Sequence, residues 1–272
     1  MDLLPVLFVG LLGVAAYFHT TNPHMVQSVR HIATGKPGCL PLESIGNVTF
    51  HYFAGRGRGE HIRLLMEDGG ISYTETHYTR ETWPAAKEQG LKSGLYTFGQ
   101  VPAIETTSGL RLAQSTAILR HLSRASGYDC DCDDYSWCDV LALGVEDQTT
   151  KMGRVVWAAD LDAEKRRTYL KEARTWIAYY EQHAPAGEPA ANRGYFTSGG
   201  RITWVDFAIF NFLDAHKAFA EVAMEGDKSP ADNFMAEFPR LSAFYQRFSQ
   251  RPQVAAYLAS ERRHPYSLPK KS

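Results

Sequence analysis

Hydrophobic and polar residues alternate with different periods in different segments of the chain, and these periods predict its strands and helices. Residues 48–53, VTFHYF, alternate and are rich in β-forming types, which predicts a strand. The following AGRGRG reads as a turn, and EHIRLLMEDGG, residues 60–70, puts its hydrophobic residues on one helical face before two glycines. A second strand is predicted over 72–79, and the next stretch, WPAAKEQGLK, is helical or irregular.

The segments that follow complete a small sheet unit. Residues 100–106 and 110–113 bracket a Thr-Ser-Gly turn and predict a hairpin, and residues 114–126 predict a closing helix. The resulting order, β-α-β-α-β-β-α, contains a crossover that requires a parallel pair of strands. We therefore predict an α/β domain over residues 47–127.

The remainder of the chain has a helical period. Helices are predicted over 134–158, 162–184, 203–219, 237–249 and 252–261. Thr203 and Asp206 have the spacing of a capping box, and Ile202 and Phe207 flank it as a hydrophobic staple. An all-α domain is predicted over residues 128–272.

An uncharged hydrophobic run occupies residues 3–18. As a helix it would be about 24 Å long, against about 30 Å for a bilayer core. The nearest cations, Arg30 and Lys36, follow the run, which favours a retained single-pass membrane anchor with the downstream domain facing the cytosol. The alternative is a cleaved signal peptide and the secretory pathway. Residues 1–20 are thus an anchor or signal segment, and 21–46 a tether.

The composition excludes several classes of protein. The chain is 44% hydrophobic and 22% charged, close to the globular average, so a collagen, a disordered tail and a disulfide miniprotein are excluded. Lysine and arginine number 29 against 30 acidic residues, a formal charge of −1. Proteins that bind nucleic acid through phosphates normally carry a cationic excess, so nucleic acid is not an expected partner.

Three of the four cysteines lie close together. Cys130, Cys132 and Cys138 fall in GYDCDCDDYSWC, whereas Cys39 stands far upstream. A disulfide scaffold would spread its cysteines through a shorter chain, and no histidine or further cysteine has zinc-site spacing here. We expect reduced thiols and no metal site.

Two places in the sheet unit have the residue types of a ligand site. Pro102, between Val101 and Ala103 at the start of a strand, is explained either by a cis bond that presents the backbone of Val101 or by an edge-strand position. Gln114 and Ser115 open the next helix, where unpaired N–H groups and a hydroxyl suit a carboxylate, although serine here is also a common cap.

Tyr52 is the candidate reactive group. It ends the first strand beside a turn that carries Arg56 and Arg58, and its phenol could donate to a substrate anion. The carboxyl ends of strands are where open α/β sheets bind ligands, which favours this role over a core tyrosine. Ala54 and Gly55 stand where a thioredoxin-type enzyme needs cysteine, so thiol–disulfide exchange by a protein thiol is disfavoured.

Taken together, these segments resemble the cytosolic glutathione S-transferase family. HYFAGRGRGEHIRLLMEDGG, ETWPAAK, FGQVPAIE and LAQSTAILRHL are similar to its amino-terminal domain, and GVEDQ, ITWVDFAIF and RPQVAAYLAS to its helical domain. The resemblance covers about residues 47–268 and implies a thioredoxin-like domain followed by an all-α domain. Tyrosine at position 52 and the WPAAK segment place the chain nearest the sigma and pi classes.

The resemblance also implies the site residues. Tyr52 would be the catalytic residue that stabilises the glutathione thiolate, and Asp147 would reach across a homodimer interface to the γ-glutamyl ammonium. The implied glutathione-binding set is Tyr52, Arg58, Trp83, Lys87, Gln100, Val101, Pro102, Gln114, Ser115 and Asp147. Extra residues after Trp83 make Lys92 the alternate to Lys87, and Gly153 and Trp157 would line the pocket for the hydrophobic substrate.

The implied activity is transfer of the glutathione thiolate to hydrophobic electrophiles, with glutathione as co-substrate and no metal. A thiol with a pKa of about 8.5 is mostly protonated at neutral pH, and a hydrogen bond to the thiolate favours the reactive form. Tyr52, with an ordinary pKa of about 10, would act as a neutral donor. Glutathione-dependent isomerisation (prostaglandin D synthase-like), peroxide reduction and non-catalytic binding are the alternatives on the same site.

Overall fold

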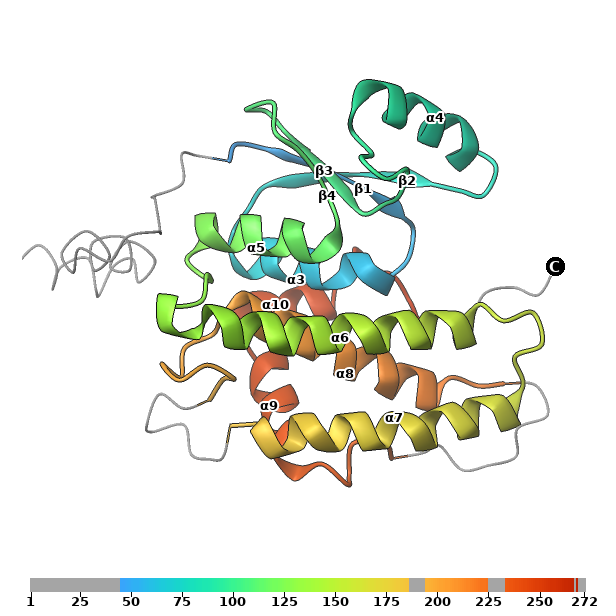
Figure 1. Ribbon diagram of the computed structural model, residues 1–272, viewed down its shortest axis with the longest axis vertical. Helices are drawn as coiled ribbons and strands as arrows, with labels where there is room; N and C mark the ends of the chain where they lie inside the picture. Colours follow the sequence, from blue (N-terminus) through green and yellow to red (C-terminus); the bar gives the residue numbers. More distant parts are fainter. Residues whose placement is uncertain (1–44, 186–193, 225–232, 267, 269–272) are drawn as a thin grey trace, which may run out of the picture.

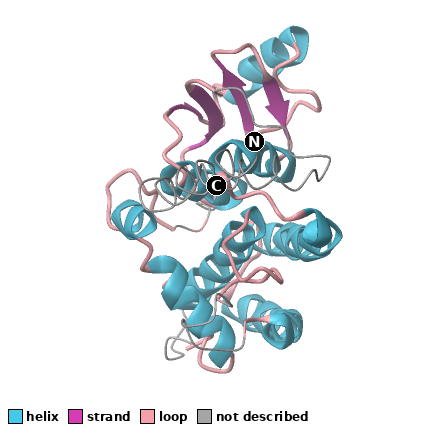
Figure 2. Ribbon diagram, turned by 90° about the vertical axis from the view of Figure 1, so that its left-hand side faces the viewer, coloured by secondary structure: helices cyan, strands magenta, loops and turns pink. Residues whose placement is uncertain are grey.

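The computed structural model describes residues 45–185, 194–224, 233–266 and 268. The expected anchor or signal segment lies outside the described residues, as do almost all of the tether and Cys39. A four-stranded sheet lies at one end of the described part and a layer of helices at the other (Figures 1 and 2). The first domain precedes the second along the chain, as the sequence predicts.

The sheet has the strand order β2-β1-β3-β4. Its strands are β1 (Val48–Phe53), β2 (Tyr73–Tyr78), β3 (Ala103–Thr106) and β4 (Arg111–Ala113). β1 pairs in parallel with β2, Val48 opposite Tyr73, and antiparallel with β3, which in turn pairs antiparallel with β4. The predicted parallel crossover and hairpin are confirmed.

Helices α3 (Glu60–Asp68) and α5 (Ser115–Ser126) pack together beneath the sheet (Figure 1). A short 3-10 turn, η1 (Gly57–Gly59), leads from β1 into α3. The stretch predicted as helical or irregular forms a helix, α4 (Trp83–Ser93), with a proline in its first turn, where its missing N–H costs nothing.

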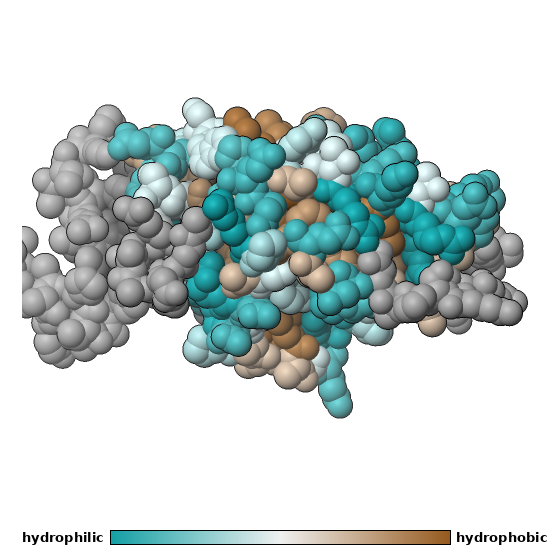
Figure 3. Space-filling model, turned by 90° about the horizontal axis from the view of Figure 1, so that it is seen from below, coloured by the Kyte–Doolittle hydropathy of each residue, from teal (hydrophilic) through white to brown (hydrophobic). Residues whose placement is uncertain are grey.

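The second half of the described chain is helical. After η2 (Cys132–Asp134) come α6 (Tyr135–Val156), α7 (Ala163–His183), α8 (Trp204–Glu221), α9 (Pro239–Ser249) and α10 (Pro252–Leu258). α8 is the central element, since most of its side chains are buried, Trp204 and Phe210 among them, and it packs on both α6 and α3. The end of the molecule opposite the sheet is mainly hydrophilic in the part that Figure 3 draws in colour.

The start of α8 has the predicted capping box. Asp206 accepts hydrogen bonds from the Thr203 N–H at 2.7 Å and, in addition, from the Phe196 N–H at 3.1 Å. Burial raises the pKa of this carboxyl to about 6. The Asp206 carboxylate therefore fixes both the start of α8 and the segment at Phe196 that precedes it.

Two arginines near the end of the chain tie the helical layer to α3. Arg251 binds the buried carboxylate of Asp68 at 2.6 Å. Arg263 binds the fully buried Glu60 at 3.0 Å and Asp214 of α8 at 2.6 Å. The sequence predicted that α10 ends at residue 261, but the helix ends at Leu258. The segment that follows it carries Arg263 to Glu60 and Asp214.

The expectation of reduced thiols at the start of α6 is wrong for two of the three cysteines. Cys130 and Cys138 form a disulfide, and Cys132 carries the free thiol. The turn η2 folds the chain back so that the two Cα atoms lie 6.8 Å apart, within the range a disulfide can bridge. Spacing along the sequence did not reveal this approach.

The predicted membrane-anchored localisation is also wrong. None of the helices in the described ranges is long and apolar enough to cross a membrane. The run on which that prediction rested, residues 3–18, lies outside them.

Candidate glutathione site

A cavity of about 530 Å³ opens between the edge of the sheet unit and α6. Its lining residues are Phe53, Arg58, Trp83, Lys87, Gly99, Gln100, Val101, Pro102, Gln114, Ser115 and Glu146. Eight of these belong to the predicted glutathione-binding set, so segments far apart in the sequence meet here. Phe53, Gly99 and Glu146 were not predicted.

The amino terminus of α5 forms one end of the cavity. Gln114 precedes the helix with φ 75° and ψ 113°, a conformation that a residue with a side chain rarely adopts. Such strain persists only where the surrounding structure enforces it, and it is typical of ligand sites. Ser115, the first helical residue, is buried beside the unpaired amides of the first turn. This end of the cavity suits a carboxylate.

The middle of the cavity is formed by the segment before β3. The Val101–Pro102 peptide bond is cis, which is the first of the two alternatives that the sequence left open. β3 begins only at Ala103, so the backbone groups of Val101 precede the paired part of the strand. They are available to a ligand that runs along this edge.

Tyr52 lies beneath the turn that borders the cavity. Its Oη atom accepts a hydrogen bond from the Arg58 N–H at 2.9 Å, and within the described ranges no hydrogen bond uses the phenol hydrogen. Tyr52 itself is not among the lining residues, whereas Phe53 and Arg58 are. Burial raises the pKa of Tyr52, although the Arg58 N–H and the charges of Arg58 and Arg63 oppose this. The phenol therefore stays protonated at neutral pH.

Two glycines allow the turn to lie directly on the phenol. A Cβ atom at Gly57, which has φ +40°, would lie 2.7 Å from Tyr52 Oη, and one at Gly59 would lie 2.7 Å from Tyr52 Cδ1. Any larger side chain would push the ring away. The GRG sequence thus fixes the position of the hydroxyl as well as the course of the turn.

Arg58 connects this turn to α6. Its guanidinium binds Glu146 and donates to Thr150 Oγ1, the latter at 2.8 Å. The sequence predicted Arg58 as a contact to a carboxylate of the ligand, and the structure shows a protein carboxylate on it. Glu146 gave no local signal, because 88 residues separate it from Arg58.

The two lysine alternatives occupy different places. Lys87 lines the cavity, and its side chain passes close to Gly99. Lys92 pairs with Glu88 at 2.6 Å on the exposed face of α4, with a side chain that is 74% exposed. Only Lys87 is thus placed to contact a ligand in this cavity.

The three predicted residues of α6 and its end lie outside the cavity lining. Asp147 is exposed on α6, next to Glu146. Gly153 has open space where a Cβ would stand, and Trp157 is 65% exposed with Arg80 over its ring.

One cluster has the residue types of a metal site. Ligand atoms of Glu75, His77 and His264 lie within 4.8 Å of one another. However, Arg63 binds the Glu75 carboxylate at 2.8 Å, and its charge opposes a cation there. We assign no metal to this cluster.

Comparison with known proteins identifies the family of this chain. Residues 48–124 match the family model of the glutathione S-transferase N-terminal domain, and residues 146–261 that of the C-terminal domain. Glutathione S-transferase P of Homo sapiens is 31% identical over 213 residues, 78% of this chain and 91% of that protein. Glutathione S-transferase P 1 of Xenopus laevis is 29% identical over 214 residues, 78% and 92% of the two chains.

The solved structures agree on the fold. The pi-class glutathione S-transferase of Onchocerca volvulus matches with a TM-score of 0.62 and 25% identity, covering 78% of this chain and 91% of that one. The predicted fold, a thioredoxin-like domain followed by an all-α domain, is confirmed. This chain belongs to the glutathione S-transferase family.

Proposed function

We propose that the cavity beside the sheet binds glutathione and that Tyr52 stabilises its thiolate for attack on a hydrophobic electrophile. The protein is a glutathione transferase by its family, and the proposal concerns how its own residues perform the transfer. The observation that carries it is that one cavity is lined by a helix start suited to a carboxylate and by the segment before β3, and is bordered by the turn that lies on the Tyr52 phenol.

Each part of the tripeptide has a matching feature. The γ-glutamyl carboxylate would bind at Gln114 and Ser115, where the helix dipole and unpaired amides favour negative charge. The cysteinyl backbone would pair with Val101, beside Gln100 and the cis Pro102. The glycine carboxylate would meet the Lys87 ammonium, with the Trp83 indole beside it.

The thiol would then lie near the turn of η1. Tyr52 Oη already accepts from the Arg58 N–H, which polarises the phenol, so its hydrogen is the part that remains for the sulfur. A hydrogen bond to the thiolate stabilises the charged form and lowers the pKa of the bound thiol. The thiolate attacks the electrophile, a carbon–sulfur bond forms, and the leaving group departs with the bonding electrons.

Two further features complete the proposal. The exposed position of Asp147 on α6 suits a contact to glutathione in the partner of a homodimer, as the family resemblance implies. Gly153, with open space where a Cβ would stand, and the exposed Trp157 would contact the electrophile, as the family resemblance implies. The relatives reported above carry pi-class or P names, and assignment to the sigma class stays a prediction, as do isomerisation and peroxide reduction.

The activity is tested with the purified full chain, glutathione and 1-chloro-2,4-dinitrobenzene. We expect conjugate to form well above the uncatalysed rate, with saturation in glutathione. Retention on a glutathione resin without any conjugation of several electrophiles would instead indicate a non-catalytic binding protein.

Ser115→Ala tests the carboxylate end of the site. Loss of one hydrogen bond to a charged group should raise the KM for glutathione about tenfold or more and leave kcat nearly unchanged. Ser123→Ala, which removes a buried hydroxyl from the same helix outside the cavity, is the matched control. Equal KM values for the two variants would contradict the assignment.

A further inference from the structure

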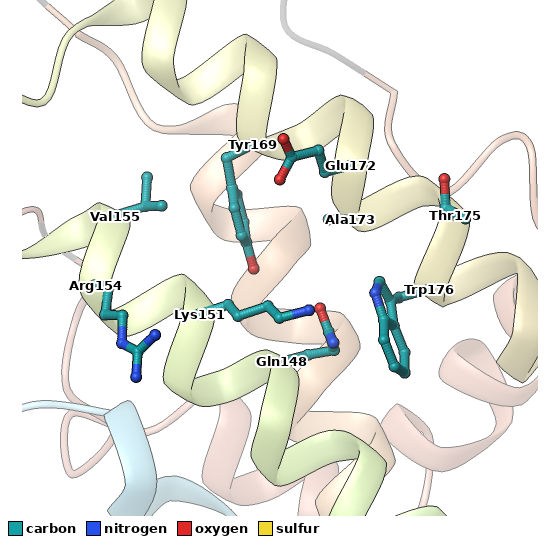
Figure 4. Close-up of a pocket in the computed structure, with 9 residues that line it drawn as sticks. All are labelled: Gln148, Lys151, Arg154, Val155, Tyr169, Glu172, Ala173, Thr175 and Trp176. Carbon is teal, nitrogen blue, oxygen red and sulfur yellow. The ribbon is translucent and has the colours of Figure 1, made fainter.

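Buried side-chain nitrogens that find no hydrogen-bond partner among the described residues occur in both domains. One is Nε2 of Gln148, which lines a cavity of about 500 Å³ between α6 and α7 that shares no residue with the glutathione site (Figure 4). Another is Nε2 of His51, on β1 directly before Tyr52. Such groups are unfavourable and rare in folded proteins. The one at His51 belongs to a side-chain cluster that leads to the glutathione site.

This cluster consists of three polar side chains on the face of the sheet opposite Tyr52. Successive residues of a strand point to opposite faces, so His51 points away from α3 and towards the side of the sheet on which α4 lies (Figure 1). Its Nδ1 atom lies 2.9 Å from Tyr78 Oη and 3.4 Å from Tyr96 Oη, and the two phenols hydrogen-bond to each other. His51 is 8% exposed and Tyr96 2%. The three side chains therefore form one buried polar network.

Tyr96 connects this network to the backbone of the glutathione cavity. Its N–H donates to Gly90 O at 3.1 Å, and its own carbonyl accepts from the Gly99 N–H at 2.9 Å. A Cβ atom at Gly90 would lie 1.9 Å from the Tyr96 ring, so the ring packs directly on α4. Gly99 lines the cavity, as do Gln100 and Val101 after it. The position of Tyr96 therefore sets the position of residues 99–101.

The same phenols also hold the indole of the cavity. The ring centres of Tyr78 and Tyr96 each lie 5.4 Å from that of Trp83, and both pairs are tilted. Aromatic pairs with such separations attract each other beyond the area that they bury. Since Trp83 lines the cavity, the network meets the glutathione site at a second place.

Hydrogen bonds give this network an effect that apolar packing would lack. They are directional, so they fix one orientation of the Tyr96 phenol. Burial lowers the pKa of His51, although the charge of Glu105 opposes this, so the imidazole is neutral at pH 7 and can accept a hydrogen bond. Departures from full satisfaction of buried polar groups are typical of functional sites, and the far end of this network lies at one.

We propose that His51 is a positioning residue for glutathione, which acts through Tyr78 and Tyr96 to hold Trp83 and residues 99–101 in the geometry that binds the tripeptide. The inference rests on the function proposed above, because it requires glutathione in this cavity. None of the three network residues lines the cavity, so their effect is on binding and not on the attack by the thiolate.

His51→Val tests the inference, because valine removes both ring nitrogens and is itself a good strand residue. We expect the KM for glutathione to rise about fivefold or more, since Tyr96 is no longer fixed, while kcat at saturating glutathione stays within about twofold because Tyr52 is untouched. Calorimetric titration with S-hexylglutathione should show the same loss of affinity. Tyr96→Phe, which keeps the ring, should give the same division between KM and kcat and replaces His51→Val if that variant does not fold.

Coupling between the two positions distinguishes one network from two separate defects. If His51 acts through Tyr96, combining the two changes should raise the KM no more than about twofold above the larger single effect. A rise equal to the product of the two single effects would contradict the network.

Thr106→Val is the matched control. Thr106 is 5% exposed on β3, bonds Ser108 Oγ at 2.8 Å and the Leu110 N–H at 3.1 Å, and does not line the cavity. This variant should keep the KM within about twofold, even where urea unfolding shows a loss of stability equal to that of His51→Val. An unchanged KM in His51→Val, or an equal rise in Thr106→Val, would refute the positioning role. A wild-type chain that forms no conjugate and does not bind S-hexylglutathione would instead refute the proposed function.

Discussion

Tyr52→Phe is expected to lower conjugation at neutral pH by about 10- to 100-fold, because a hydrogen bond to a charged group contributes about 1.5–3 kcal/mol. The lost donor raises the pKa of the bound thiol towards its ordinary value of about 8.5. The rise of kcat/KM with pH should therefore move to higher pH, and the two enzymes should converge in alkaline solution. Rates from acid to alkaline pH, with glutathione affinity measured by direct titration, check this.

The control is Tyr73→Phe on β2, which removes a hydroxyl that donates a hydrogen bond to Glu67 of α3 at 2.6 Å, away from the cavity. It should leave the pH profile unchanged. Burial raises the pKa of Tyr52, so ionisation of the phenol itself should not contribute below pH 10, its ordinary value. If glutathione binding by Tyr52→Phe collapsed while the rate of the bound enzyme stayed normal, the role as thiolate donor would be wrong.

Glu60→Ala is expected to reduce the free energy of unfolding by about 3–5 kcal/mol. Glu60 is fully buried and accepts from Tyr257 Oη at 3.1 Å and Arg263 Nε at 3.0 Å, with Arg63 at 3.4 Å. Removing the carboxylate leaves buried donors without an acceptor and uncompensated positive charge. Urea unfolding followed by circular dichroism measures the loss.

An exposed ion pair provides the matched control for this variant. Glu105 pairs with Arg111 at 2.7 Å, with side chains that are 37% and 44% exposed. Glu105→Ala should cost less than about 1 kcal/mol, because water screens such pairs. Equal losses of stability in the two variants would show that the burial of Glu60 does not determine how much it contributes to the free energy of unfolding.

Local sequence patterns were sufficient to predict features that depend on a single strand or helix. Alternation over residues 48–53 predicted β1, and the spacing of Thr203 and Asp206 predicted the start of α8. The carboxyl end of a strand, a proline and a helix start also pointed to Arg58, Val101, Pro102, Gln114 and Ser115, which line the cavity, whereas Trp83, Lys87 and Gln100 followed only from the family resemblance. Each of these signals lies within a few residues and has a direct physical cause.

Contacts between distant segments were not predictable in this way. Arg58 meets Glu146 only because η1 and α6 face each other in the fold. The choice between Lys87 and Lys92 depends on the phase of α4, since five residues turn a helix by about 140° beyond one full turn and place the two side chains on different faces. The disulfide between Cys130 and Cys138 depends on the turn η2.

The arginines after α9 set a limit on where the polypeptide can be shortened. A fragment that stopped before Arg251 would keep Asp68 and Glu60 on α3 but lack both guanidinium groups that now neutralise them. Those two acids would then be left without these counter-charges on the helix that follows the η1 turn. The thioredoxin-like half and the last helix are thus one inseparable unit, and loss of the final segment by proteolysis or a premature stop codon should be as damaging as a lesion in the sheet.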